Sequence, residues 1–156
     1  MSKPRLENRG AGPAGLYHEA IVEVARRACG SGRLETPDAS VSVDNPLCGD
    51  RVSLDVHVGD GRLRGVAHRV RGCLLCEAAA SIIAANAVGE TAAELQSVSA
   101  ALADALVTGF DGRSLPWQDL AVFAPVADYR SRHRCVTLAF EAVVSAMAKA
   151  ETGNGA

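Results

Sequence analysis

The chain has few aromatic residues, little net charge and no long apolar run. Aromatic side chains make up only 4% of its 156 residues, so the core has to be built from Ala, Val, Leu and Ile. A formal net charge of −2 argues against nucleic-acid binding, which needs a strongly basic face. No apolar run approaches the roughly 18 residues of a membrane span. The N-terminal residues MSKPRLENRG lack the apolar segment of a secretory signal. These absences predict a cytoplasmic protein without nucleic-acid or membrane partners.

Cysteine is what the composition does supply. The chain carries five cysteines, an odd number, and a reducing compartment disfavours structural disulfides. Its length is that of one domain, which buries a sizeable core without covalent links. We expect a disordered arm over 1–14, a single domain over 15–150 and a flexible tail over 151–156, because the two ends are rich in Gly and polar residues.

The hydrophobic pattern predicts an α+β fold. Three runs of alternating apolar residues, near 41–43, 54–58 and 66–70, predict antiparallel strands, with a hairpin turn at Gly59-Asp60-Gly61. Helical spacing predicts helices, whose ranges are 16–28, 73–87, 91–107 and 131–150. The third of these opens on the capping box Thr91-Ala-Ala-Glu94. The stretch 109–125 is expected to be an irregular loop with a short turn of helix. The order of elements predicts a three-stranded antiparallel sheet with helices packed against it.

Four of the cysteines fall near the ends of predicted elements. Cys48 lies in the loop Asp44-Asn-Pro-Leu-Cys-Gly-Asp50, and Cys73 and Cys76 lie where the third strand turns into a helix. Cys135 lies near the start of the last helix. Helix N-termini stabilise thiolates. With Asp50 two residues beyond Cys48, the set suits tetrahedral zinc or a small iron–sulfur cluster.

The remaining candidates are weaker. Cys29 is expected to be a small buried residue on the first helix, and His57 and His68 are expected on the solvent face of strands. Cys76 shares a helix face with Cys73. It fits a fourth metal thiolate that displaces Asp50, a simple buried thiol, or a redox partner of Cys73. A thioredoxin-like protein is disfavoured because no βαβ pattern is present.

Three motifs resemble those of the IscU/NifU-like iron–sulfur cluster assembly proteins. They are Asn45-Pro-Leu-Cys-Gly-Asp-Arg51, Gly72-Cys73 at the start of an Ala/Ser-rich helix, and Arg132-His-Arg-Cys-Val-Thr-Leu-Ala139. Cys73 follows Cys48 by 25 residues and Cys135 follows Cys73 by 62, intervals similar to those of the SufU branch. The resemblance implies a SufE/NifU-like (IscU-like) fold. It also implies zinc bound by three Cys and one Asp, which fall on Cys48, Asp50, Cys73 and Cys135.

The resemblance further implies a cysteine desulfurase (SufS-like) as sulfur donor and cluster-receiving proteins downstream. Cys48 on its Gly-flanked loop is the expected acceptor of persulfide sulfur, with Arg132 or Arg134 stabilising the released anion unless both are simply solvated. Asp50 is expected to be the ligand that lets the site open. The protein is then a zinc-dependent sulfur carrier rather than a turnover enzyme. The alternative is a scaffold that holds a [2Fe–2S] cluster on Cys48, Cys73 and Cys135 plus Cys76 or Asp50. The sequence predicts no oligomeric state.

Overall fold

The computed structural model describes residues 19–155. The expected arm over 1–14 and the first residues of the helix expected over 16–28 lie outside them. The elements in chain order are α2 (Glu19–Arg27), β1 (Ala39–Asn45), β2 (Asp50–Gly59), β3 (Arg62–Arg71), α3 (Leu74–Asn86), α4 (Ala92–Thr108), the 3₁₀ helices η3 (Gln118–Asp128) and η4 (Arg130–Arg132), and α5 (His133–Gly155). The predicted α+β class is confirmed.

The strands form one antiparallel sheet in the order β1-β2-β3, so the central strand β2 pairs with both neighbours. Alternation along β2 directs Val52, Leu54 and Val56 to the inner face, where each is fully buried. The predicted turn after Gly59 is present, and both Asp60 and Gly61 have positive φ angles, as a tight two-residue hairpin turn requires.

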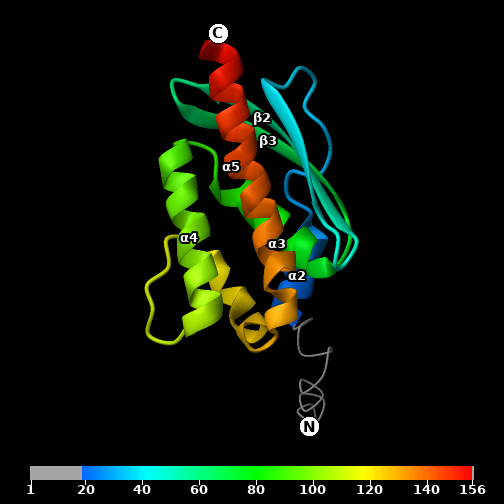
Figure 1. Cartoon of the computed structure of the whole chain (residues 1–156), viewed down its shortest axis with the longest axis vertical. Coiled ribbons are helices and arrows are strands. Elements are labelled where there is room, and N and C mark those ends of the chain that lie inside the picture. Colours follow the sequence, from blue (N-terminus) through cyan, green and yellow to red (C-terminus); the bar gives the residue numbers. More distant parts are fainter. Residues whose placement is uncertain (1–18, 156) are drawn as a thin grey trace.

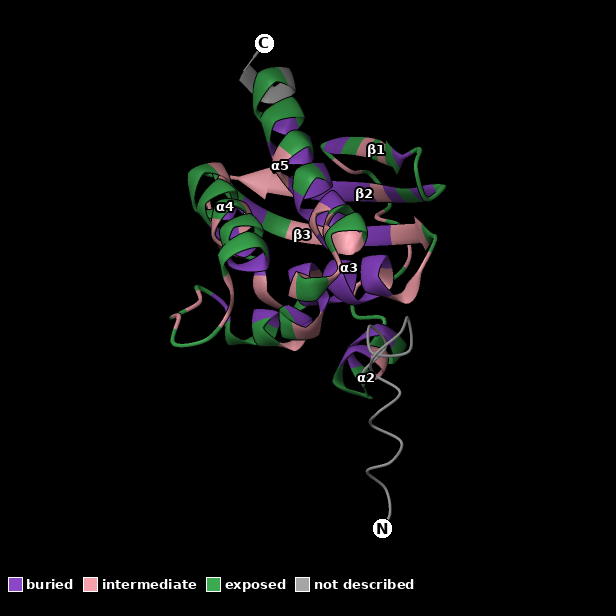
Figure 2. Cartoon of the chain, turned by 60° about the horizontal axis from the view of Figure 1, so that its bottom comes forward, coloured by how far each residue is buried: buried purple, intermediate pink, exposed green. Residues whose placement is uncertain are grey.

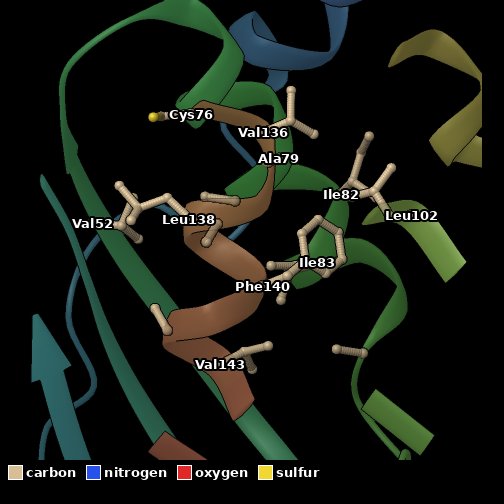
Figure 3. Packing of buried hydrophobic residues seen from close by; sticks show 14 of the residues in the cluster. Val52, Cys76, Ala79, Ile82, Ile83, Leu102, Val136, Leu138, Phe140 and Val143 are labelled. Atoms are coloured by element: carbon tan, nitrogen blue, oxygen red, sulfur yellow. The ribbon is translucent and has the colours of Figure 1, made fainter. Parts of the chain in front are cut away.

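The long helix α5 covers β1 and β2 on the inner face of the sheet, while α3 contacts β3. Helix α5 also packs against α3 and α4, as Figure 1 shows, while α2 packs against α3. In Figure 2, β2 is largely buried beneath α5, whereas α4 is exposed along one side. The core contains Ile82, Leu102 and Phe140, whose side chains meet between α3, α4 and α5 (Figure 3). Full burial of each such side chain stabilises the fold by about 1.5–3 kcal/mol.

The end of the last helix and the length of one 3₁₀ helix differ from expectation. The helix α5 continues past Ala150 to Gly155, through residues expected to form a flexible tail. The short turn of helix expected within the loop over 109–125 is the longer 3₁₀ helix η3, which continues to Asp128 and buries Leu120, Phe123 and Val126. These three residues are spaced three apart, and this is the period that places side chains on one face of a 3₁₀ helix. No helix within residues 19–155 is long and apolar enough to cross a membrane.

Two side chains differ in burial from what the sequence predicts. Cys29 is exposed, because α2 ends at Arg27 and a positive φ at Ala28 turns the chain away from the helical path. His68 is buried, because it pairs with Leu54 across the sheet and shares its inner face. His57 keeps partial exposure, as predicted.

Candidate metal centre

Cys48 lies in the turn that joins β1 to β2. The backbone carbonyl of Asn45 accepts the N–H groups of Cys48 and Gly49 at 3.2 and 2.8 Å, and the Asn45 side chain accepts that of Leu47 at 3.3 Å. Gly49 adopts a φ of 75°, a conformation that favours glycine. The resulting turn leaves Cys48 exposed and Leu47 94% exposed. The sequence therefore presents a free thiol at the tip of a hairpin.

Asp50 is the first residue of β2 and is only 3% exposed. Its Oδ1 accepts the backbone N–H of Cys73 at 3.2 Å, and its Oδ2 accepts the thiol of Cys135 at 3.3 Å. A Cβ atom at Gly72 would overlap the Asp50 carboxylate, so glycine is required beside it. Two hydrogen bonds from different helices thus hold the Asp50 carboxylate in place.

Cys73 and Cys76 lie at the start of α3. Cys73 is the N-cap residue and is half-buried, whereas Cys76 in the first turn is fully buried. The Cys76 thiol donates a hydrogen bond to the backbone carbonyl of Cys135, with 3.1 Å between sulfur and oxygen. This bond joins the first turn of α3 to the first turn of α5.

Cys135 is the third residue of α5 and is fully buried. Its sulfur lies 3.9 Å from the sulfur of Cys48, although 87 residues separate the two along the chain. All five cysteines, each within the described residues, are free thiols. The four residues that the sequence marked as ligands, together with Cys76, therefore converge at the ends of β1, β2, α3 and α5.

The ligand atoms fall into two groups that share Asp50. One consists of Cys48, Asp50 and Cys135, the other of Asp50, Cys73 and Cys76, and within each group all ligand atoms lie within 4.8 Å of one another. Two sulfurs bound tetrahedrally at about 2.3 Å from zinc lie about 3.8 Å apart, close to the 3.9 Å between Cys48 and Cys135. Soft thiolates with one carboxylate fit zinc or an iron–sulfur cluster. The residues present thus fit the implied metal.

The thiols of Cys73, Cys76 and Cys135 have different pKa values. Hydrogen bonds from Cys135 and Cys76, with backbone N–H groups of the first turn of α3, lower the pKa of Cys73. The hydrogen bond with Cys73 raises the pKa of Cys135 to about 12, and hydrogen bonds with Cys135 and Cys73, together with burial, raise the pKa of Cys76. The hydrogen bonds thus favour the thiolate form at Cys73 over Cys76 and Cys135, and metal binding has to displace the protons of the remaining thiols.

The two arginines occupy different places. Arg132 lines an open hollow of about 430 Å³ together with Leu47, Cys48 and Ser131. Arg134 is exposed and forms an ion pair with Glu141 at 3.0 Å on the surface of α5. The structure thus brings Arg132, but not Arg134, to the side from which Cys48 is reached. Ser131 was missed by sequence reasoning, since a lone serine before the last motif carries no recognisable pattern.

Comparison with known proteins agrees with this geometry. Residues 16–136 match the family described as NifU-like N terminal domain. The chain belongs to this family. Its similarity to solved structures includes the crystal structure of a NifU-like protein (N-terminal) from Brucella abortus, with a TM-score of 0.77, 32% identity, and coverage of 88% of this chain and 95% of that one. The IscU/NifU-like resemblance and the fold expected from it are therefore confirmed.

Two relatives of the chain have names that correspond to the two functional alternatives, cluster scaffold and sulfurtransferase. The iron–sulfur cluster assembly scaffold protein IscU of Streptococcus pyogenes is 29% identical over 136 residues, covering 85% of this chain and 82% of that protein. The zinc-dependent sulfurtransferase SufU of Bacillus subtilis is 25% identical over 139 residues, covering 89% and 94%. The crystal structure of SufU from Fervidobacterium islandicum shares the fold, with a TM-score of 0.77 at 19% identity.

Proposed function

We propose that this NifU-like protein serves iron–sulfur cluster assembly by accepting sulfur on Cys48 at a metal site formed with Asp50, Cys73 and Cys135. The observation that carries the proposal is the position of Cys48: it is exposed at a hairpin tip, yet its sulfur lies 3.9 Å from the buried Cys135. A thiol in this position is reachable by a protein donor and can also join the buried ligands.

Sulfur transfer needs a thiolate as nucleophile. Bound zinc would supply this, because it holds a coordinated thiol in its deprotonated form at neutral pH. The Cys48 thiolate attacks the outer sulfur of a donor persulfide, a new S–S bond forms on Cys48, and the donor cysteine leaves as a thiolate. Arg132, which lines the same hollow, adds positive charge beside the outgoing anion. The protein then acts as a sulfur carrier rather than as a turnover enzyme.

The partner that fits this chemistry is a cysteine desulfurase of the SufS type, with cluster-receiving proteins downstream. Of the four residues that line the hollow, Leu47 is an apolar side chain that is 94% exposed immediately before the acceptor. A donor protein that reaches Cys48 through this open hollow would contact Leu47 and Arg132 as well.

The second candidate is a scaffold that holds a [2Fe–2S] cluster. It is favoured by one observation, the presence of a fourth thiol, Cys76, within 4.8 Å of Asp50 and Cys73. Elemental analysis of protein purified without oxygen separates the candidates. Near-stoichiometric zinc without visible absorption supports sulfur transfer, whereas a brown protein with acid-labile sulfide supports the scaffold.

The direct test measures activation of a cysteine desulfurase by the zinc-loaded protein, followed as alanine released from cysteine. The Cys48→Ser variant should give no activation. The Cys29→Ser variant is the matched control, because Cys29 is the other exposed cysteine and lies outside both ligand groups. Activation that survives in Cys48→Ser, or that is lost equally in Cys29→Ser, would contradict the assignment of Cys48 as acceptor.

A further inference from the structure

The two overlapping ligand groups contain one more thiol than a tetrahedral site needs. Cys48, Asp50 and Cys135 form the first group and Asp50, Cys73 and Cys76 the second. Together they offer five ligand atoms, and a tetrahedral zinc ion takes four. The question is which residue is outside the ligand set at each stage of the reaction.

The five residues differ in how easily each can move away from a bound metal. Asp50 is anchored by the hydrogen bond that it accepts from the backbone N–H of Cys73, and Cys73 and Cys135 lie at the starts of α3 and α5. Cys48 alone is both exposed and carried by a turn rather than a helix. Its displacement therefore disturbs neither the sheet nor a helix.

Cys76 is the opposite case. It is fully buried, and its thiol hydrogen is engaged by the carbonyl of Cys135. In the view of Figure 3 its sulfur points away from the core side chains of Ala79 and Val136. Its sulfur lies within 4.8 Å of both the Asp50 carboxylate and the Cys73 sulfur. Cys76 is thus next to the ligands without access to a protein donor.

We propose that Cys76 is a reserve ligand, which takes the place of Cys48 among the metal ligands while Cys48 carries sulfur. The inference rests on the proposed function. When the Cys48 sulfur forms its S–S bond with the transferred sulfur, the S–S bond of the donor breaks. The donor thiolate takes up, through solvent, the proton that the Cys76 thiol gives up. The Cys76 sulfur then replaces the Cys48 sulfur beside Asp50, Cys73 and Cys135, so charge and ligand number are unchanged.

The same geometry argues against the exchange of Cys76 for Asp50. Both ligand groups include Asp50, and its carboxylate is 3% exposed. Releasing it from the metal would leave a buried carboxylate with fewer partners, and this is costly. Releasing Cys48 exposes a sulfur that water and the donor protein can both reach. The exchange therefore lets the protein carry sulfur without losing its metal.

The test is a double-mutant cycle on zinc affinity, measured by competition with a chromophoric chelator. The Cys76→Ser substitution keeps a hydroxyl donor for the Cys135 carbonyl, and thermal unfolding of each variant checks that the fold is retained. We expect Cys76→Ser to change the zinc dissociation constant by less than about threefold and Cys48→Ser to raise it about tenfold. The double variant should raise it at least about a thousandfold.

Cobalt(II) loading supplies a second readout, since the intensity of the thiolate-to-cobalt charge-transfer band follows the number of bound thiolates. Cys48→Ser should keep the wild-type intensity, whereas Cys48→Ser with Cys76→Ser should lose one thiolate. The matched control, Cys48→Ser with Cys29→Ser, should behave as Cys48→Ser alone. Additive affinity changes, or a band already reduced in Cys48→Ser, would overturn the reserve-ligand role.

The outcome for the reserve ligand is separable from that for the proposed function. If Cys48 accepts sulfur but Cys48→Ser loses a cobalt-bound thiolate, the sulfur carrier stands and the reserve ligand fails. If Cys48→Ser keeps its thiolate count but wild-type protein accepts no sulfur, ligand replacement stands and the proposed function fails.

Discussion

The carboxylate of Asp50 accepts a hydrogen bond from the backbone N–H of Cys73 at 3.2 Å. Because Cys73 is the N-cap residue of α3, this bond places a negative charge at a helix N-terminus, where it is stabilised. The same carboxylate meets the thiol of Cys135 at the start of α5. One side chain from the sheet thus sets the positions of two helix ends that carry ligands.

Enlarging Gly72 should disturb this arrangement. In the Gly72→Ala variant the new Cβ would overlap the Asp50 carboxylate, so Asp50 has to move away from Cys73. We expect zinc affinity to fall at least about tenfold, the scale seen when a group that orients metal ligands is lost. Chelator competition measures the change.

The control for Gly72→Ala is Gly89→Ala. Gly89 also has a positive φ, of 97°, but a Cβ there meets nothing within 4 Å. This variant therefore carries backbone strain of about 1–2 kcal/mol without a clash at the site. It should lower stability and leave zinc affinity unchanged. Equal losses of affinity in the two variants would mean that the contact with Asp50 is not the cause.

A second carboxylate should govern stability in acid. Burial alone would raise the pKa of Asp55, but hydrogen bonds from Arg69, Ser40 and the Leu34 N–H lower it to about 2. The unfolded chain binds this proton near pH 4. The folded state binds it only at lower pH, so the stabilisation by Asp55 is complete above about pH 4. It is lost as the pH falls towards 2.

Removing the partner of Asp55 tests this. Arg69 holds the Asp55 carboxylate with two hydrogen bonds of 3.1 Å. Arg69→Met should cost about 2 kcal/mol or more at neutral pH and move acid unfolding to higher pH, because a buried carboxylate loses its charge partner. Arg64 lies on the same strand as Arg69 and forms an exposed ion pair with Asp60 in the preceding turn, so Arg64→Met should cost no more than about 0.5 kcal/mol. Urea unfolding measures both, and indistinguishable losses would contradict the account.

His68 should make stability depend on pH in a higher range. Its Nε2 lies 2.7 Å from the Cys29 carbonyl and so carries the hydrogen, whereas Nδ1 is buried without a partner among the described residues. Burial lowers the pKa of His68, and the nearby charge of Arg69 acts in the same direction. Glu77 lines the same small cavity.

The folded state therefore binds the His68 proton more weakly than the unfolded chain, whose pKa is about 6.5. The stabilisation of the folded state that neutral His68 contributes is complete above about pH 6.5 and is lost as the pH falls below this value. His68→Gln keeps a donor for the Cys29 carbonyl but cannot titrate. Its free energy of unfolding should fall less between about pH 7.5 and pH 5.5 than that of the wild type. Parallel curves for the two proteins would show that His68 is not the group responsible.

The sequence was sufficient to predict structural features that depend only on residues close together in the chain. The capping box at Thr91 and Glu94 forms as expected at the start of α4, and the turn at Asp60-Gly61 closes the β2–β3 hairpin. These features depend on residues within a few positions of each other. Motifs and their intervals mark the four residues predicted to be ligands, and in the structure each of them belongs to one of two residue groups that share Asp50.

Features that depend on contacts between elements could not be predicted. The residues around His68 in the sequence do not show whether its side chain lies on the inner or the outer face of the sheet. Its pairing with Leu54 places it on the inner face. Cys29 follows a helix whose end is set by the positive φ of Ala28. The bond from Cys76 to the Cys135 carbonyl joins residues 59 positions apart, so the sequence left the role of Cys76 open.

The central claim is that Cys48 is the residue that receives sulfur. Mass spectrometry of peptides from zinc-loaded protein, after brief incubation with a cysteine desulfurase and cysteine, locates the added sulfur. Free thiols and persulfides are alkylated first to prevent exchange. The account predicts one additional sulfur atom on the peptide that contains Cys48 and none on those that contain Cys29, Cys73 or Cys135. Added sulfur on any of these other peptides while Cys48 remains unmodified would contradict it.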